Sequence, residues 1–218
     1  MMARPSEQQQ SLYRLAFVKN CFVLVVRAYG AMDSRSLKTA EEPHITDELV
    51  RSARTLIESD EAELWMEPME VLDDPPQALA GRYGKKRPRI DIEIVRTGRG
   101  RRPRFHIEAK RLYRPDSVNE YFGPRGLQMF IHGEYAGAWP SVGMLGYVQS
   151  DTCAIWLSRM ASGFVARRVE IYACAGIPDW ALAGWEGDGL EGVHTSQHER
   201  PRPDLGRIQI FHLLLEFT

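Results

Sequence analysis

The sequence predicts an α/β protein with a mixed central β-sheet flanked by α-helices. Three observations lead to this fold class. Apolar residues recur at helical spacing near the N-terminus, apolar and charged residues alternate in two neighbouring segments around residue 100, and apolar runs occur at 141–149 and 208–217. With 218 residues, 44% of them apolar and 26% charged, the chain is long enough for one domain spanning residues 1–218.

Two helices are expected in the first quarter of the chain. The first covers residues 7–29, where Leu12, Leu15 and Phe22 belong to a broad apolar stripe, and Gly30 is a suitable stop. A polar loop from 32 to 44 precedes the second helix, which begins with Thr46 as its N-cap and acidic residues in its first turn.

Two strands joined by a glycine-rich turn are expected next. A loop over residues 73–89 leads into a strand at 89–96, and a turn at 97–101 leads to a strand at 104–112. Isoleucines alternate with acids in the first strand, and apolar residues alternate with His, Glu and Lys in the second. Side chains alternate between sheet faces, so each strand has an apolar face and a charged face.

The rest of the chain supplies the remaining layers of the predicted fold. A short helix is expected at 127–135, a buried strand at 141–149, and a helix at 153–160 capped by Asp151 or Thr152. Further strands are expected at 169–175 and 208–217, with a long surface loop at 184–207 between them. In that loop His194 and His198 have a spacing seen in zinc sites, but no cysteine pair accompanies them, so a solvated loop is preferred.

Bulk properties favour a cytoplasmic protein that does not enter membranes. No run of about 18 apolar residues occurs. The first ten residues lack the basic start and apolar stretch of a secretory signal. Three cysteines, an odd number without CxxC spacing, favour free thiols in a reducing compartment.

Positive charge is concentrated around the predicted hairpin, although the net charge of the chain is only −1. Residues 82–114 contain 13 Lys or Arg against three acids. A basic surface around a small acidic centre suits a polyanion held over a metal site, and the alternative is a solvated arginine-rich hairpin tip. The residues expected to contact phosphates are Lys85, Lys86, Arg87, Arg89, Arg111 and Arg114.

The acidic centre itself combines Asp91 with the Glu108-Ala109-Lys110 triplet. If the turn is centred between residues 99 and 100, Asp91 lies across from Glu108, with about 5 Å between their Cβ atoms. Two carboxylates this close repel each other unless a cation lies between them or one takes a proton. With Lys110 beside them, these residues supply the parts needed for metal-assisted phosphodiester hydrolysis. Glu93, on the same face, either is a spare ligand or pairs with nearby arginines.

At Asp91 and Glu108-x-Lys110 the chain resembles the PD-(D/E)XK nuclease superfamily, which has the restriction-endonuclease-like fold. The resemblance covers a helix, a strand with Asp and a strand with Glu-x-Lys; it departs at Ile90, where the family often has proline. It implies Mg²⁺ or Mn²⁺ as the cofactor, bound by Asp91, Glu108 and the carbonyl oxygen of Ala109. Catalysis is then assigned to Asp91, Glu108 and Lys110.

The resemblance also suggests further site residues on two helices. Glu48 is either a first-turn acid that stabilises its own helix or a third carboxylate at the metal site. Gln128 and Tyr135 resemble a Gln and a Tyr found after the Glu-x-Lys strand in one branch of the family, although their spacing differs. Gln128 is therefore either a substrate contact or a helix-surface residue.

The sequence thus predicts a metal-dependent nuclease that acts on DNA, with RNA as the alternative substrate. The family resemblance implies a role in restriction, phage defence or repair. The family resemblance further implies a homodimer or a subunit of a larger complex. Two other classes fit the same residues. One is a non-catalytic nucleic-acid-binding subunit, and the other is an adaptor whose basic hairpin binds an acidic protein surface.

Overall fold

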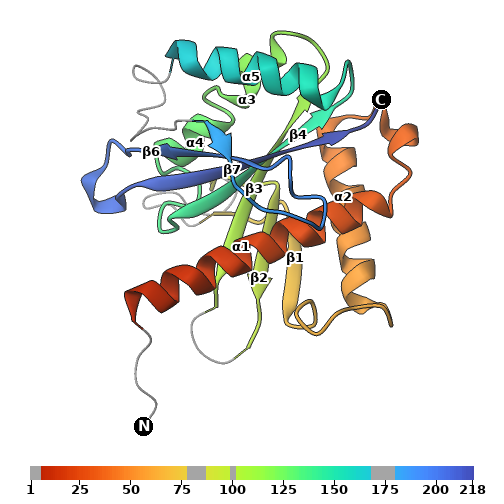
Figure 1. Cartoon of the computed structure of the whole chain (residues 1–218), viewed down its shortest axis with the longest axis vertical. Helices are drawn as coiled ribbons and strands as arrows, with labels where there is room; N and C mark the ends of the chain where they lie inside the picture. Colours follow the sequence, from red (N-terminus) through yellow and green to blue (C-terminus); the bar gives the residue numbers. More distant parts are fainter. Residues whose placement is uncertain (1–5, 78–86, 99–101, 168–179) are drawn as a thin grey trace.

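A mixed β-sheet runs through the middle of the molecule (Figure 1). The computed structural model describes residues 6–77, 87–98, 102–167 and 180–218. Within them, seven strands pair in the order β1-β2-β3-β4-β7-β6-β5. The central pairs β3–β4 and β4–β7 are parallel and the outer pairs are antiparallel. The strands are β1 (Met69–Asp73), β2 (Ile92–Arg96), β3 (Arg104–Leu112), β4 (Ser141–Val148), β5 (Ala181–Leu182), β6 (His194–His198) and β7 (Ile208–Glu216).

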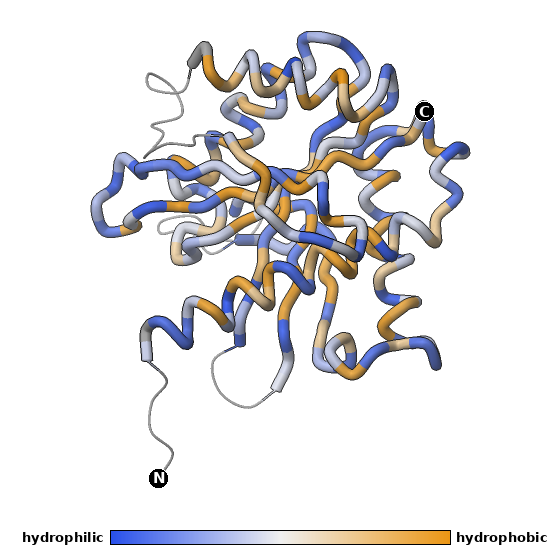
Figure 2. Tube along the Cα trace, viewed as in Figure 1, coloured by the Kyte–Doolittle hydropathy of each residue, from blue (hydrophilic) through white to orange (hydrophobic). Residues whose placement is uncertain are grey.

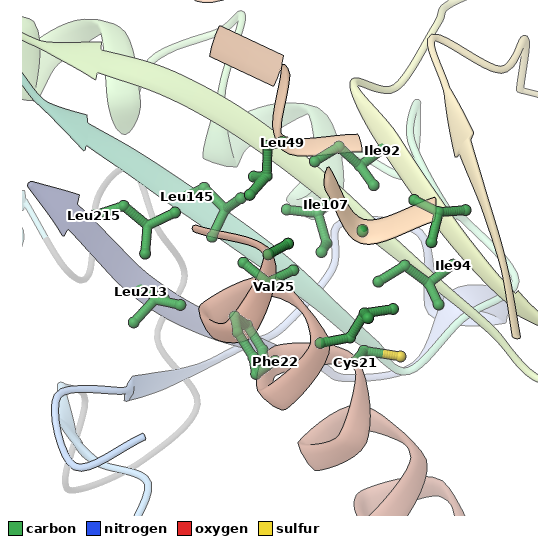
Figure 3. Close-up of a cluster of buried hydrophobic side chains, with 14 of the residues drawn as sticks. Cys21, Phe22, Val25, Leu49, Ile92, Ile94, Ile107, Leu145, Leu213 and Leu215 are labelled. Atoms are coloured by element: carbon green, nitrogen blue, oxygen red, sulfur yellow. The ribbon is translucent and has the colours of Figure 1, made fainter. Parts of the chain in front are cut away.

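Helices cover both faces of this sheet, as the predicted fold class requires. On one face, α1 (Glu7–Gly30) and α2 (Glu42–Glu58) pack against strand residues such as Ile94, Ile107 and Leu213 (Figure 3). On the other face, α3 (Ser117–Tyr121), α4 (Leu127–Ile131) and α5 (Cys153–Arg167) pack against residues such as Met144 and Ile210. Hydrophobic residues gather along the strands and the helix segments packed on them (Figure 2).

The first helix forms where its apolar stripe predicts. Ser6 accepts a hydrogen bond from the backbone N–H of Gln9, whose side chain in turn accepts one from the N–H of Ser6. The apolar stripe of α1 places Phe22 and Val25 in the core, where Figure 3 shows them facing the sheet. A short 3-10 helix, η1 (Ser34–Leu37), follows within the segment expected to be a polar loop.

The second helix begins five residues earlier than predicted, with Glu41 as its N-cap and Glu42 as its first residue. Pro43 in its first turn supports the start, because proline fits the first helical turn, where its missing N–H leaves no hydrogen bond unmade. Thr46 is therefore not an N-cap. Its hydroxyl lies inside the protein and bonds to the hydroxyl of Tyr147 on β4 at 3.0 Å.

The sheet also contains strands that the sequence did not predict. β1 lies just before the segment 73–89, which was expected to be the loop into the hairpin, and β6 lies inside the expected surface loop at 184–207. β6 reads His-Thr-Ser-Gln-His, so it shows no apolar alternation, and pairing with β7 holds it in the sheet. His198 is buried in it and bonds to Ser196, so the expectation of a solvated histidine pair was wrong.

The other predicted elements differ mainly at their ends. β3 matches its predicted bounds, and β4 and β7 lie within one residue of theirs. α4 is four residues shorter than expected, α5 is seven residues longer, and α3 was not predicted. The strand expected at 169–175 and much of the hairpin turn lie outside the described residues. No helix in the described part of the chain is long and apolar enough to cross a bilayer.

Candidate functional site

The candidate site lies where β2 ends and leaves one edge of β3 open. Pairing between these strands stops at Ile92 opposite Ile107, so β3 continues without a strand on that side. Two carboxylates take the place of the missing strand. Asp91 Oδ2 accepts the backbone N–H of Ala109 at 2.7 Å, and Glu42 Oε2 accepts the N–H of Arg111 at 3.1 Å. The observed pairing of Ile92 with Ile107 has the predicted register, and the next position along each strand places Asp91 beside Glu108.

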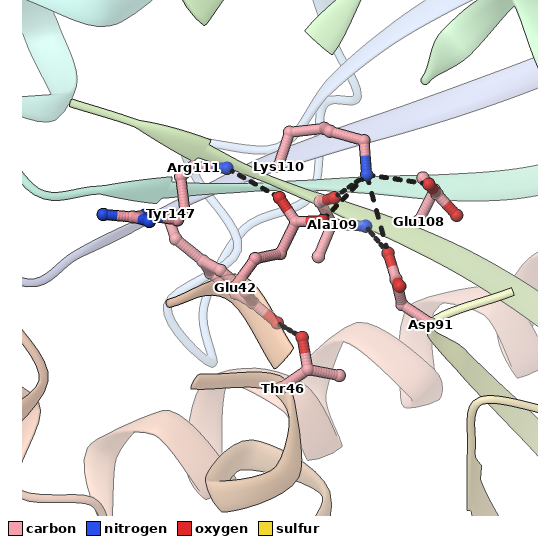
Figure 4. Close-up of polar contacts among 8 residues, drawn as sticks. All are labelled: Glu42, Thr46, Asp91, Glu108, Ala109, Lys110, Arg111 and Tyr147. Carbon is pink, nitrogen blue, oxygen red and sulfur yellow. Dashed lines mark hydrogen bonds and ion pairs between the residues drawn. The ribbon is translucent and has the colours of Figure 1, made fainter. Parts of the chain in front are cut away.

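Lys110 lies at the centre of this group (Figure 4). Its Nζ is 2.6 Å from the carbonyl oxygen of Ala109 and 2.8 Å from Glu108 Oε1. Glu42 Oε1 is 3.0 Å away and Asp91 Oδ2 is 3.9 Å away. One ammonium group therefore contacts all three carboxylates, which come from α2, from the residue just before β2 and from the middle of β3. β2 begins at Ile92, three residues later than predicted, so Asp91 precedes the strand.

The three carboxylates carry more negative charge than one lysine neutralises. Burial, reinforced by the neighbouring Asp91, raises the pKa of Glu108 to about 8. Burial also raises the pKa of Asp91, against the lowering effects of Lys110 and the N–H of Ala109. The pKa of Lys110 is raised despite burial, since the three acids favour its charged form. The cluster therefore holds an extra proton near neutral pH.

One oxygen of this cluster has no partner. Glu108 is 4% exposed, and its Oε2 makes no hydrogen bond to any described residue. A buried carboxylate oxygen without a donor is costly, and either a proton shared with Asp91 or a cation between the two acids would satisfy it. Oxygen ligands from two carboxylates and a carbonyl suit Mg²⁺ or Mn²⁺. The described residues hold no group of three His, Cys, Asp or Glu side chains arranged as a metal site, so a cation would rely on Asp91, Glu108 and the Ala109 carbonyl oxygen.

The cluster opens into a cleft of about 550 Å³ between the N-terminus of α2 and the α3–α4 segment. The cleft is lined by acidic and basic side chains from both sides, with Met129 and Tyr135 as its apolar part; the lining residues are Glu42, Arg89, Asp91, Glu108, Lys110, Asn119, Glu120, Gly123, Pro124, Arg125, Met129 and Tyr135. A larger hollow of about 990 Å³ lies elsewhere, beside the N-terminal part of α1 and Trp139. None of the cluster residues lines that hollow.

Glu48, suggested by the sequence as a third carboxylate, is not brought to this cluster. It pairs with Arg51 at 2.9 Å and lines a different hollow with residues of η1 and of the segment that joins α1 to η1. Glu42, six residues earlier, points to the cluster instead. Six residues turn an α-helix by roughly 240°, so the two glutamates face different directions. With the helix start placed at Thr46, Glu42 fell in a loop, and no sequence signal identified it.

The predicted phosphate-binding residues have mixed positions. Arg89 lines the cleft while pairing with Asp74 at 2.5 Å. Arg111 is only 16% exposed and is bound to Glu41 and Gln149, so it is occupied inside the protein. Arg114 pairs with Asp116 and Glu120 at the surface. Lys85 and Lys86 lie outside the described residues, and Arg87 is the first described residue after them.

Other predicted features of the site also changed. Met129 and Tyr135 line the cleft, whereas Gln128, from the same segment, is not among its lining residues. The charged face of the hairpin is buried rather than exposed. His106 is 3% exposed and lies against Trp139. Glu93 pairs with Arg104, which confirms the second of its two interpretations, an ion pair with a nearby arginine. Burial lowers the pKa of His106 to about 4, so this histidine is neutral at physiological pH.

Comparison with known proteins gave no match to this chain. No family model, no curated protein and no solved structure is significantly similar to it.

Proposed function

We propose that this protein is a metal-dependent nuclease with a restriction-endonuclease-like fold that hydrolyses phosphodiester bonds in DNA. The observation that carries the proposal is the meeting of Asp91, Glu108 and Lys110 at the open edge of β3, with one Glu108 oxygen unsatisfied. Ala109 adds its carbonyl oxygen to the same group. The order of these residues in the sequence and their convergence on one cleft support the same reading.

The residues divide into those that would hold a cation and those that would contact substrate. Asp91, Glu108 and the Ala109 carbonyl would bind Mg²⁺ or Mn²⁺. Such an ion supplies charge neutralisation at the phosphate and a bound water of lowered pKa. Lys110 is the nearest cation to these oxygens and would stabilise negative charge that develops on the phosphate.

The cleft offers further contacts for a phosphate backbone. Arg89 and Arg125 line it with exposed side chains. Contacts of this kind bind a polyanion without reading its bases, so the proposed activity is independent of sequence and sensitive to salt. Arg111 and Arg114 do not line the cleft and are bound to carboxylates of the protein itself, so they are left out of the proposed substrate contacts. We assign the activity to the cytoplasm, because three cysteines without CxxC spacing favour free thiols in a reducing compartment.

Cleavage of defined nucleic acids tests this proposal. Purified protein is incubated with supercoiled plasmid, single-stranded DNA or RNA, with Mg²⁺ or with a chelator. Asp91→Asn and Lys110→Met are compared with Asp47→Asn and Lys38→Met, which make the same changes at exposed positions. We expect Mg²⁺-dependent cleavage of DNA that falls at least about 100-fold in the first two variants and persists in the controls.

The other outcomes identify the competing functions. DNA binding without cleavage in every variant would contradict the nuclease and indicate a binding subunit. If the protein neither binds nor cleaves DNA, the adaptor is the better explanation. Preferential cleavage of RNA would keep the chemistry and change the substrate class.

A further inference from the structure

The Lys110 ammonium occupies a place that suits a metal ion. Three oxygens surround it within 3.0 Å, from Ala109, Glu108 and Glu42, and Asp91 follows at 3.9 Å. Two of these close oxygens and Asp91 belong to the group that would bind the divalent cation. A metal ion and the ammonium group would therefore compete for the same oxygens, because two cations bound to them would lie close enough to repel each other.

We propose that Lys110 is the internal counter-ion of the metal-free site, and that a divalent cation displaces its ammonium group, which Glu42 then retains. This inference rests on the proposed function, because it assumes the cation. It adds a role for Glu42, which acts on the lysine as a positioning residue and does not bind the metal.

Glu42 is fixed well enough to serve this purpose. One of its oxygens accepts the backbone N–H of Arg111 at 3.1 Å, and the other accepts from Lys110 at 3.0 Å. Its own position at the N-terminus of α2 favours a carboxylate there. A lysine side chain is flexible and only its tip must move, so the ammonium can leave Glu108 and Asp91 while it keeps its bond to Glu42.

The unpaired oxygen of Glu108 shows that Lys110 satisfies this carboxylate incompletely. With Lys110 in place, Glu108 Oε1 is bound and Oε2 is buried without a partner. The lysine therefore satisfies only half of this carboxylate. A divalent ion of higher charge would neutralise the cluster more completely, which supplies the driving force for the exchange.

Binding of Mn²⁺ to the purified metal-free protein tests the exchange, with affinity measured by titration calorimetry. Lys110→Met removes the competing ammonium and keeps an unbranched side chain, and Lys38→Met makes the same change at an exposed position. We expect Lys110→Met to bind Mn²⁺ about tenfold more tightly than wild type, and Lys38→Met to match wild type. Equal or weaker binding by Lys110→Met would overturn the proposal.

A double-mutant cycle then separates the two roles open to Glu42. If Glu42 acts through the lysine, Glu42→Gln weakens Mn²⁺ binding at least about threefold more in wild type than in Lys110→Met. If Glu42 were itself a ligand, the loss would be the same in both backgrounds, and the positioning role would be overturned. A circular dichroism spectrum and melting curve of each metal-free variant confirm that it is folded before its affinity is compared.

The two proposals fail in different ways. Mg²⁺-dependent cleavage together with unchanged Mn²⁺ affinity in Lys110→Met would retain the nuclease and reject the exchange. No Mn²⁺ binding by wild type or by Lys110→Met would reject both.

Discussion

Glu108 occupies the least favourable electrostatic position in the candidate site. Its carboxyl group is almost fully buried and lies beside Asp91, and among the described residues Lys110 donates its one hydrogen bond. These conditions favour the protonated form, which explains why its pKa is raised to about 8. A carboxyl group with a raised pKa binds its proton more tightly in the folded protein than in the unfolded chain. Stability in the absence of a cation is therefore lost as pH rises towards that pKa.

The first prediction concerns this pH dependence. Between about pH 5 and pH 8 the metal-free wild type should lose stability relative to Glu108→Gln, by at most about 1.4 kcal/mol per pH unit. Glutamine keeps the shape of the side chain but cannot lose a proton. Urea unfolding at a series of pH values measures this difference, and Glu70→Gln on the exposed side of β1 controls for loss of a surface carboxylate. Parallel pH profiles of wild type and Glu108→Gln would contradict the assignment.

Single residues of the site were predicted from the sequence to different extents. Asp91, Glu108 and Lys110 could be found because strand alternation fixes which side chains share a face, and the turn length fixes the register. Glu42 could not be found, because its role depends on where α2 begins and how α2 crosses the sheet. Arg111 illustrates the same limit: its charge was visible in the sequence, but its burial against Gln149 was not.

At the scale of elements, the site depends on how α2 docks against the sheet. The helix carries Glu42 at its first turn and a buried hydrogen bond one turn later, from Thr46 to the Tyr147 hydroxyl at 3.0 Å. Both hydroxyls are inside the protein, so each needs the other as a partner. This bond ties the start of α2 to β4 and so holds Glu42 near Lys110.

The second prediction follows from that bond. Thr46→Val keeps the volume of the side chain and leaves the Tyr147 hydroxyl buried without its partner, which should cost about 1–3 kcal/mol. Urea unfolding measures the loss. Thr55→Val on the exposed side of the same helix is the control, because its hydroxyl bonds only to the carbonyl of Arg51. If both variants are equally stable, the buried bond does not anchor the helix.

The third prediction concerns the turn between α3 and α4, which forms one wall of the cleft. A Cβ atom added at Gly126 would lie 2.3 Å from the carbonyl oxygen of Tyr121, and backbone atoms cannot easily move aside. Gly126→Ala should therefore destabilise the protein by about 1–3 kcal/mol, as seen in thermal or urea unfolding. At Gly30, where a new Cβ would meet nothing within 4 Å, the same change should be neutral or slightly stabilising. Equal effects at both glycines would show that this turn tolerates a side chain.

Elements with strong periodicity were predicted well and weakly patterned ones were missed. α1, β3, β4 and β7 have long apolar stripes or alternation and were found near their observed bounds. β6 has a polar sequence, and it is a strand because β7 offers an edge for pairing and because Ser196 bonds to His198 and His212 in the interior. Such tertiary support leaves no local signal in the sequence.

At the scale of the whole molecule, the cleft lies where the two helical layers meet the open edge of β3. α2 belongs to the layer on one face of the sheet, and α3 and α4 belong to the other. A cation bound by Asp91 and Glu108 at the edge of the sheet would leave the Lys110 ammonium paired with Glu42 of α2. Any ligand that binds the folded state alone also stabilises it.

The fourth prediction is that Mn²⁺ raises the melting temperature. At 100 times its dissociation constant an ion adds about 2.7 kcal/mol, which for a chain of this length corresponds to roughly 5–10 °C. Differential scanning fluorimetry with and without Mn²⁺ measures the shift. It should persist in Asp47→Asn and disappear in Asp91→Asn, and a shift of equal size in both variants would place the ion elsewhere.

The most direct test of the account is a crystal structure determined with Mn²⁺, using anomalous scattering to locate the ion. The account predicts one or more anomalous peaks bounded by Asp91, Glu108 and the carbonyl oxygen of Ala109, with the Lys110 ammonium moved towards Glu42. Fully occupied Mn²⁺ at other positions, with Lys110 still bound to Glu108 and no peak between the two acids, would contradict it.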